Sequence, residues 1–207
     1  MLQLINYDLQ EPVKNYDTLK ESVEHLGGGI HILNGPWIYG ADRSPREVLA
    51  AITGELAMED PDDRNDKLLV FPVHMGELGT GRNLKHRSSQ PHRGGKVFAV
   101  TCTSRNPSGP FHTSKAAHKG HRIDVTEALN SLGNTCHPLE SLWFVKTDHT
   151  AHDVHLALEK AVPLNPKDEL MVAEVDLEAS LHGKPVRGAE EGLDPEDRDW
   201  LVKARVL

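Results

Sequence analysis

The most concentrated chemistry in this 207-residue sequence lies in a long basic stretch without acidic residues. From Leu78 to Ile123 there is no Asp or Glu, although the whole chain holds 31 acidic residues and has a net charge of −8. A cationic surface on an otherwise acidic protein attracts polyanions, so a nucleic acid, RNA or DNA, is the natural partner. A solvated basic loop without a ligand is the alternative. The stretch contains five His and nine Lys or Arg residues, the latter being Arg82, Lys85, Arg87, Arg93, Lys96, Arg105, Lys115, Lys119 and Arg122.

One segment of this stretch places its cations just before a predicted helix. Residues 105–124 read RNPSGPFHTSKAAHKGHRID. The unpaired amide hydrogens and the positive dipole at a helix N-terminus would add to the cationic side chains. The segment therefore predicts a phosphate-binding site, with an exposed loop as the alternative. The side chains that would contact phosphate are His112, Lys115, His118, Lys119, His121 and Arg122.

Other reactive residues lack the spacing that their chemistry requires. The chain has no G-x-x-x-x-G-K loop and no Ser or Cys in a nucleophile elbow, which argues against motor, kinase and related hydrolase chemistry. Cys102 and Cys136 are too few for a disulfide scaffold and are predicted to be buried thiols. His149, His152 and His155 lie three apart around a predicted helix start, so we expect them at a solvated edge.

The sequence that surrounds these residues contains one pattern twice. Residues 19–52 align without a gap to residues 125–158, and nine of the 34 positions are identical. Trp37 and Trp143 are one identical pair, and we expect both as core anchors between helix and sheet. A repeat of this length predicts two domains of one fold in a single polypeptide.

Each copy predicts the order strand, helix, strand, strand, helix, strand. In the first copy, residues 2–9 form the opening strand, and Thr18 with Glu21 predicts a capping box at the start of the first helix. In the second copy, Asp124 and Glu127 repeat this box. The first helix of each copy is therefore expected to begin near these residues.

Further signals mark where helices end and restart. Gly27 and Gly133 follow the first helix of each copy, where a residue in the left-handed conformation is expected. After a hairpin, Ser44 and Thr150 are the predicted N-caps of the second helices, each followed three residues later by an acidic residue. The closing strands then complete the two copies.

The order of elements predicts an α+β fold of two tandem ferredoxin-like (βαββαβ) domains that form a pseudodimer. The tail that follows them predicts either a helix beginning at Asp194-Pro195 or a strand added to a sheet edge. No run of about 18 apolar residues and no N-terminal signal pattern occur, so we expect a soluble, cytoplasmic protein without a membrane partner. The predicted boundaries are residues 1–73 for domain 1, 74–95 for a basic Gly/Ser/His linker, 96–175 for domain 2 and 176–207 for the tail.

Short motifs in both copies resemble a known family. The opening LINYDL, the hairpins GPWIYGAD and SLWFVKTD, and the closing DKLLVFPV and DELMVAEV are similar to the CRISPR-associated Cas-two family and to its VapD toxin and SinR-type relatives. The resemblance implies a homodimeric arrangement, here within one chain, and divalent-metal-dependent cleavage of RNA or DNA. It assigns the metal-binding, catalytic acid to Asp8, with Mg²⁺ as the cofactor.

The second copy departs from the family pattern at its first strand. This strand reads KVFAVTCTS, and the position that corresponds to Asp8 falls near Cys102 or Thr103. Neither residue is a hard-metal ligand comparable to a carboxylate. The resemblance therefore implies one acid site instead of a symmetric pair.

These observations favour a nucleic-acid-binding protein that acts as a Mg²⁺-dependent endonuclease at Asp8. A second hypothesis is a noncatalytic protein-interaction module of a defence, toxin or phage system, which kept the fold and lost the paired acids. A third is a small-ligand sensor, because fold alone does not assign function. His31 and His137 could serve as general acids or as packing residues. A protein partner or a homodimer formed through the C-terminal tail is compatible with each hypothesis.

Overall fold

The structure is a computed structural model in which the chain divides into two compact units. Unit 1 comprises Met1–Val73, Pro138–Glu140 and Asp176–Leu207, and unit 2 comprises His74–His137 and Ser141–Val175. Each unit combines helices with antiparallel strands, so the protein is of the α+β class. The structure describes residues 1–9, 12–27, 29–31, 36–40, 42–59, 66–74, 79–80, 95–104, 118–162 and 168–207.

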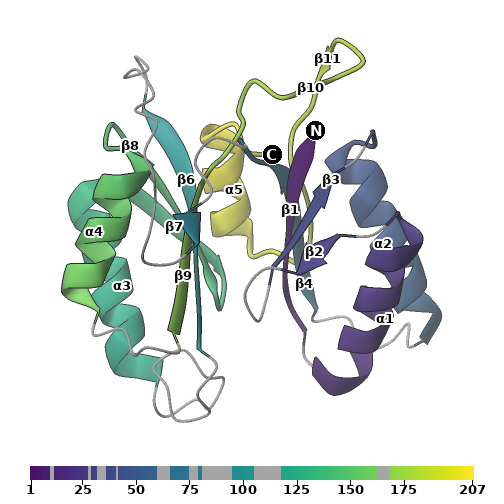
Figure 1. The fold of residues 1–207 in the computed structure, drawn as a ribbon, viewed down its shortest axis with the longest axis horizontal. Helices are drawn as coiled ribbons and strands as arrows, with labels where there is room; N and C mark the ends of the chain where they lie inside the picture. Colours follow the sequence, from purple (N-terminus) through teal and green to yellow (C-terminus); the bar gives the residue numbers. More distant parts are fainter. Residues whose placement is uncertain are drawn as a thin grey trace. The chain divides into compact units, whose positions relative to one another are not determined.

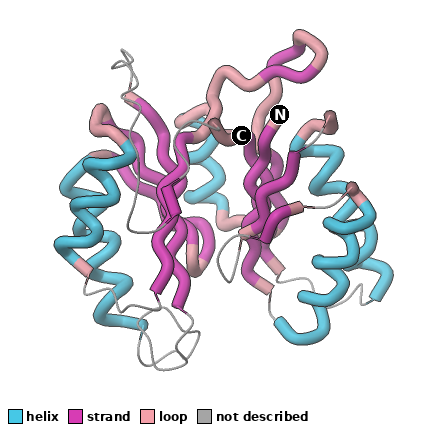
Figure 2. The backbone as a smooth tube through the Cα atoms, viewed as in Figure 1, coloured by secondary structure: helices cyan, strands magenta, loops and turns pink. Residues whose placement is uncertain are grey.

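Unit 1 contains a five-stranded antiparallel sheet with the strand order β12-β4-β1-β3-β2. Helices α1 and α2 lie on one face of this sheet (Figures 1 and 2). The tail also forms a short hairpin of β10 and β11, with His182 and Gly183 in the left-handed region at its turn. In chain order the elements are β1 (Leu2–Asp8), α1 (Pro12–His25), β2 (Ile30–His31), β3 (Trp37–Gly40), α2 (Pro45–Glu59), β4 (Lys67–Pro72), β10 (Ser180–Leu181), β11 (Lys184–Pro185), β12 (Ala189–Glu191) and α5 (Pro195–Lys203).

Unit 2 contains a second five-stranded antiparallel sheet with the order β5-β9-β6-β8-β7. Helices α3 and α4 lie on one face of it (Figure 1). Strands β6, β7, β8 and β9 and the two helices follow the same order along the chain as β1 to β4 with α1 and α2. The elements are β5 (Gly79–Thr80), β6 (Lys96–Ser104), α3 (His118–Leu132), β7 (Asn134–Leu139), β8 (Leu142–Thr147), α4 (Ala151–Ala161) and β9 (Asp168–Glu174).

The two helix-facing cores use matching positions of the repeat. Trp37 is 5% exposed and Trp143 is 1% exposed, and each packs among residues of the flanking strands and helices. The prediction that both are core anchors is confirmed. The opposite face of each sheet also carries buried apolar side chains, beside the buried polar residues Asn6 and Thr101. The apolar ones include Leu4, Leu69 and Phe71 in unit 1, and Val97, Ala99 and Phe144 in unit 2.

The outer strand beside the closing strand of each unit comes from a distant part of the chain. The chain leaves β4 of unit 1 and forms β5, which pairs with β9 of unit 2. It later leaves β9 and forms β12, which pairs with β4 of unit 1. Each sheet therefore has an outer strand from the part of the chain that follows the closing strand of the other sheet, β5 after β4 and β12 after β9.

The predicted starts of the first helices are wrong. Helix α1 begins at Pro12 and helix α3 at His118, so Thr18 and Asp124 lie inside helices instead of capping them. Proline at the first helical position has the required φ and lacks only an amide that would have no helical partner, which favours the earlier start of α1. The hydroxyl of Ser22 donates a hydrogen bond to the Thr18 carbonyl at 2.8 Å, as expected within a continuous helix.

The predicted capping boxes of the second helices are confirmed. The Thr150 hydroxyl accepts from the Asp153 amide at 3.2 Å, and the Thr150 amide donates to the Asp153 carboxylate at 3.0 Å. Ser44 and Glu47 form the same reciprocal pair, with the Ser44 amide donating to Glu47 at 2.7 Å. These hydrogen bonds from the caps hold the pKa of both carboxyls below the usual values.

The two glycines that follow the first helices have different roles. Gly27 has a φ of 117°, as expected for a left-handed residue at a helix end. Gly133 is not in that region, so this part of the prediction is wrong. A Cβ atom at Gly133 would lie 2.2 Å from the Lys146 carbonyl oxygen, so glycine is needed there because the backbone of β8 comes so close.

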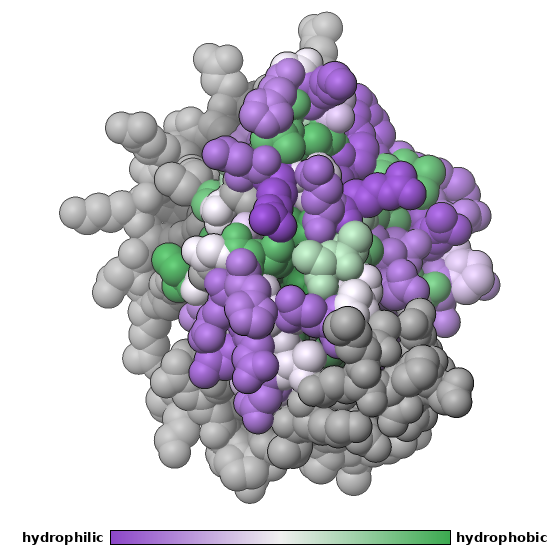
Figure 3. All heavy atoms as spheres, turned by 90° about the vertical axis from the view of Figure 1, so that its right-hand side faces the viewer, coloured by the Kyte–Doolittle hydropathy of each residue, from purple (hydrophilic) through white to green (hydrophobic). Residues whose placement is uncertain are grey.

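The predicted solvated edge of three histidines is wrong at one position. His149 is exposed, but His155 is only 7% exposed and faces the core from α4. The prediction of buried thiols is confirmed for Cys102 and Cys136. On the side of the molecule that carries α1 and α2, the described surface is mainly polar with small apolar patches (Figure 3). Among the described residues, no helix is long and apolar enough to cross a membrane.

Candidate functional site

Asp8 is the last residue of β1, at the end of a strand that lies between β4 and β3. Side chains alternate along a strand, and Ile5 belongs to the helix-facing core. Asp8, three residues further, therefore projects from the face that is turned away from α1 and α2. Asp8 as a whole residue is partly exposed.

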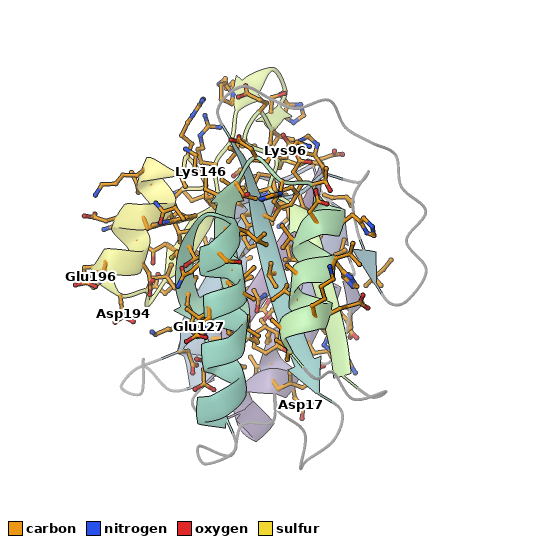
Figure 4. All side chains as sticks on the ribbon, turned by 90° about the vertical axis from the view of Figure 1, so that its left-hand side faces the viewer. Asp17, Lys96, Glu127, Lys146, Asp194 and Glu196 are labelled. Atoms are coloured by element: carbon orange, nitrogen blue, oxygen red, sulfur yellow. The ribbon has the colours of Figure 1, made fainter. Side chains whose placement is uncertain are left out.

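The neighbour of Asp8 across the sheet is Lys67, the first residue of β4. Directly paired residues of antiparallel strands project from the same face, with Cβ atoms about 5 Å apart. The Lys67 ammonium, however, donates to the Asp194 carboxylate at 2.7 Å. Asp194 and Glu196 lie at the N-terminal end of α5 (Figure 4), so the C-terminal tail contributes charge to this corner of unit 1.

The strand registers identify the position in unit 2 that corresponds to Asp8. Ile5 pairs with Trp37 in unit 1, and Val100 pairs with Trp143 in unit 2. Three residues after Val100 comes Thr103, so Thr103 occupies the place of Asp8. The ambiguity between Cys102 and Thr103 is resolved, and no carboxylate stands at the end of β6 on this register.

The opposite strand also differs between the units. Asp8 pairs with Lys67 in unit 1, whereas Thr103 pairs with Glu169 in unit 2. The two corners therefore have different residue types on both strands, as the sequence comparison of the opening strands already indicated for Asp8. The described part of the chain contains no group of three or more His, Cys, Asp or Glu side chains placed to hold a metal ion.

The segment between the first strand and the hairpin is longer in unit 2. Trp143 follows Trp37 by 106 positions, whereas Val100 follows Ile5 by 95, so unit 2 has eleven additional residues there. The structure places the end of this basic segment in the first turns of α3. The side chains of His118, Lys119, His121 and Arg122 lie outside what the structure describes. The other predicted phosphate contacts, Arg82, Lys85, Arg87, Arg93, Arg105, His112 and Lys115, lie outside the described residues altogether.

Lys96, one of the cations of the basic stretch, is buried in an ion pair and does not contribute to a basic surface. Lys96 is the first residue of β6 and donates to the Glu174 carboxylate at 2.8 Å. The two side chains are only 9% and 12% exposed. Burial and pairing withdraw Lys96 from contact with a polyanion, so the basic stretch loses one of its nine Lys or Arg residues.

The His–Trp pair that occurs in both copies of the repeat is in ring contact in each unit. The ring centroids of His31 and Trp37 are 4.7 Å apart, and those of His137 and Trp143 are 4.2 Å apart with the planes nearly parallel. In unit 2 the Trp143 indole also donates to the Thr126 hydroxyl at 3.2 Å. These contacts favour the packing role for the two histidines over the general-acid role.

In unit 1, two tyrosines extend this aromatic contact toward Asp8. The rings of Tyr7 and Tyr16 are 6.2 Å apart, and Tyr16 is 6.0 Å from His31. Burial, with a smaller contribution from Tyr16, raises the pKa of Tyr7 far above its usual value. Tyr7 therefore stays a neutral phenol and supports the strand that carries Asp8 by packing.

The sequence pointed to Asp8 but not to its cross-strand partner Lys67 or to Asp194, which accepts a hydrogen bond from Lys67. Only the strand pairing brings Lys67 opposite Asp8, and Asp194 is 127 residues away from Lys67 in the sequence. No protein-family model matches the chain, and a search of curated proteins finds no relative.

Proposed function

We propose that the protein binds nucleic acid in the cytoplasm and cleaves phosphodiester bonds with the help of Mg²⁺ at Asp8. The single observation that carries the binding function is the absence of Asp and Glu from Leu78 to Ile123 in an otherwise acidic chain. Eight Lys or Arg residues of this stretch remain for phosphate contacts after the withdrawal of Lys96. Phosphate neutralisation by such side chains supplies most of the affinity in sequence-independent binding.

The proposal includes a fold of two ferredoxin-like domains that form a pseudodimer similar to the Cas-two family. The sheet orders support it, because β4-β1-β3-β2 in unit 1 corresponds strand for strand to β9-β6-β8-β7 in unit 2. The reciprocal edge strands β5 and β12 add support. A dimer that exchanges one strand per subunit would give this connectivity if its two subunits were fused.

The residues at the corner of unit 1 fit a Mg²⁺ ion that is held mainly by water and substrate. Mg²⁺ in phosphoryl-transfer sites commonly uses one or two carboxylates and completes its shell with water and phosphate oxygens. Asp8 would supply the carboxylate, since it is partly exposed at the strand end. Bound there, Mg²⁺ would activate a water molecule and neutralise developing charge on the phosphate.

The cationic residues of unit 2 would hold the backbone of the nucleic acid. Lys115 lies just before α3, and Lys119 and Arg122 lie in its first turns. Arginine can bind a phosphate through two parallel hydrogen bonds, whereas lysine acts as a point charge. In this proposal these residues position the substrate and Asp8 supports the chemistry.

The binding function is tested by the salt dependence of affinity for labelled RNA and duplex DNA. Each lost phosphate contact lowers the slope of log K against log salt by about 0.9 on duplex DNA. The K115A/K119A/R122A variant should therefore show a slope smaller by about 2 to 3. A matched control, K20A/K160A/K203A, removes three exposed cations outside the basic stretch and should leave the slope unchanged. Salt-independent binding, or equal effects of both triple variants, would refute the proposal.

A second candidate is a noncatalytic protein-interaction module of a defence, toxin or phage system. The observation that favours it is Thr103 at the position of Asp8, because a protein that no longer cleaves has no need for the second acid. Salt-insensitive behaviour toward nucleic acid together with no cleavage would support this candidate. A protein partner or a homodimer formed through the tail would then be sought by crosslinking.

A further inference from the structure

The C-terminal tail of unit 1 contains a second, shorter segment without acidic residues. Residues 179–189 read ASLHGKPVRGA and hold His182, Lys184 and Arg187 but no Asp or Glu. Acidic residues flank this segment on both sides, and residues 190–199, which follow it directly, contain six Asp or Glu. A small basic segment therefore stands within a tail that is otherwise strongly acidic.

This segment forms the β10–β11 hairpin, and we call residues 179–187 the tail arm. The hairpin extends beyond the end of the sheet of unit 1 (Figures 1 and 2). Residues 182–185 are all exposed. A Cβ atom at Gly183 would have no described atom within 4 Å, so the tip of the arm is not packed against the described part of the chain.

The base of the tail arm, in contrast, is held by hydrogen bonds. The Val186 amide donates to the carbonyl of Ala179, which is only 3% exposed, at 2.9 Å. The Arg187 guanidinium donates to the carbonyls of Leu177 and Val186, both at 3.0 Å. Because Arg187 braces the base, the arm presents to a partner mainly the side chains at its tip.

The residue at the tip is unusual for the turn that it forms. The register leaves a two-residue turn, His182-Gly183, and the φ angles of these residues are 51° and 74°. Such turns favour Asn-Gly, Asp-Gly or Gly-Gly, because both central residues need a positive φ. Histidine adopts a positive φ less readily than glycine, so the turn itself does not require it. An exposed histidine in this conformation indicates a role toward a partner.

The tip lies near the start of α2 in the same unit. After the hydrogen bonds of its capping box, the positive charges of Arg43 and His182 also lower the pKa of Glu47. The side chains at this start have mixed charges, with exposed Asp42 and Glu47 beside exposed Arg43 and Arg46. The arm therefore adds positive charge to an end of unit 1 where the charges are otherwise balanced.

We propose that the tail arm enters the major groove of duplex DNA, where Lys184 contacts phosphates and His182 contacts base edges. From Ala179 to His182 the arm extends over three residues, or about 10 Å at the rise of a strand. The major groove of B-DNA is about 12 Å wide and about 8.5 Å deep, and it admits a two-stranded ribbon. The major groove of duplex RNA is too narrow for side chains to read, so the arm favours DNA.

This inference rests on the proposed binding of nucleic acid and names duplex DNA as the substrate class, but it does not depend on cleavage at Asp8. The test is the affinity of the full-length protein for labelled duplex DNA and duplex RNA of the same sequence, measured by fluorescence anisotropy. The variant is His182→Asn/Lys184→Gln, which creates the favoured Asn-Gly turn and so keeps the hairpin. It should weaken DNA binding about tenfold, through one base contact and one phosphate contact, and leave RNA binding unchanged.

The salt dependence and a control variant sharpen this test. Loss of Lys184 should lower the slope of log K against log salt by about 0.9 on duplex DNA. Lys203→Gln removes another exposed cation of the tail, on α5, and should change neither affinity nor slope. Equal weakening of DNA and RNA binding, or an equal effect of Lys203→Gln, would overturn the proposal.

The proposal and the proposed function can fail separately. If the arm variant binds duplex DNA like the wild-type protein while K115A/K119A/R122A lowers the slope, the role of the arm is wrong and the binding function stands. If the wild-type protein binds no nucleic acid, the proposed function is wrong and the role of the arm with it.

A second measurement tests entry into the groove itself. Dimethyl sulfate methylates N7 of guanine, an acceptor atom of the major groove. At saturating protein, the wild type should protect guanine N7 in duplex DNA, and His182→Asn/Lys184→Gln should lose this protection. No protection by the wild type, or protection that persists in the variant, would contradict entry of the arm into the major groove.

Discussion

Lys96 and Glu174 form a buried ion pair in unit 2, and we predict that breaking it from one side destabilises the protein strongly. Their charged atoms are 2.8 Å apart, and the side chains are 9% and 12% exposed. Removal of one partner leaves an uncompensated buried charge, which costs about 3 to 5 kcal/mol. Because a tenth of each side chain still reaches solvent, we expect Lys96→Met to lower the free energy of unfolding by about 3 kcal/mol.

The same reasoning predicts a different result when both charges are removed. Replacement of a buried pair by apolar residues of similar volume is often neutral or stabilising, so Lys96→Met/Glu174→Leu should recover most of the loss. The exposed pair of Lys20 and Glu24 is a matched control, with 4.0 Å between its charged atoms and side chains that are 49% and 57% exposed. Lys20→Met should cost less than about 0.5 kcal/mol.

The assay is urea unfolding followed by tryptophan fluorescence and far-ultraviolet circular dichroism. Urea is preferred to guanidinium chloride because it is uncharged and does not screen the ion pair. A cost below about 1 kcal/mol for Lys96→Met would show that the pair behaves as a surface pair. Equal costs for the single and double variants would refute the argument that the loss comes from a stranded charge. Lys96→Met should also leave the salt dependence of nucleic-acid binding unchanged, since Lys96 is withdrawn from the basic surface.

Three further predictions follow from other residues. Burial lowers the pKa of His155; the charge of Glu159 opposes this shift and that of His152 adds to it. Folding therefore favours the neutral imidazole. The stability that this site contributes is present above the ordinary pKa of 6.5 and is lost as the pH falls below it toward the lowered pKa of the folded state. His155→Leu, which copies Leu49 of unit 1, should therefore flatten the acid side of a plot of unfolding free energy against pH, and an unchanged slope would contradict this. Gly133→Ala should lower the free energy of unfolding in urea by about 3 kcal/mol, because its Cβ would meet the Lys146 carbonyl. Gly54→Ala in α2, where a Cβ would have no atom within 4 Å, should raise it by about 1 kcal/mol. A comparable loss of stability in both variants would refute the steric explanation. Thr150→Ala removes a reciprocal cap of α4 and should cost about 1 kcal/mol, which a thermal shift measurement with Thr150→Ser as the conservative control would detect.

The elements of both units could be predicted largely from local signals. The capping boxes at Ser44 and Thr150 could be predicted because each cap residue and its acidic partner are three positions apart in the sequence, and the structure contains both boxes. The apolar spacing around Trp37 and Trp143 likewise indicated which faces are buried. Such features depend on residues within one turn or one strand, so they can be predicted from the sequence.

The first residues of helices α1 and α3 were predicted wrongly because local sequence signals conflicted. Thr18 and Glu21 have the spacing of a capping box, yet Pro12 gives an earlier and stronger start to α1. Helix α3 begins among His118 and Lys119, although cations at a helix N-terminus oppose the helix dipole. Residue preferences therefore pointed away from the observed start.

The candidate site depended on contacts that no local pattern encodes. The outer strands β5 and β12 have two and three residues, too short for any periodicity to predict them. The ion pair of Lys67 and Asp194 joins residues 127 positions apart through β12. His155 lies at a core position that apolar Leu49 fills in unit 1, so residue type alone misplaced it at the surface.

We propose that Asp8 supports metal-dependent cleavage of nucleic acid. The most direct measurement is cleavage of labelled single-stranded RNA and duplex DNA with Mg²⁺, with Mn²⁺ and with chelator, by the wild-type protein and by Asp8→Asn. Asp17→Asn, which changes an exposed carboxylate on α1, is the matched control. We expect cleavage that requires the metal, is lost in Asp8→Asn and persists in Asp17→Asn. No cleavage by the wild-type protein, or cleavage that survives Asp8→Asn, would contradict it.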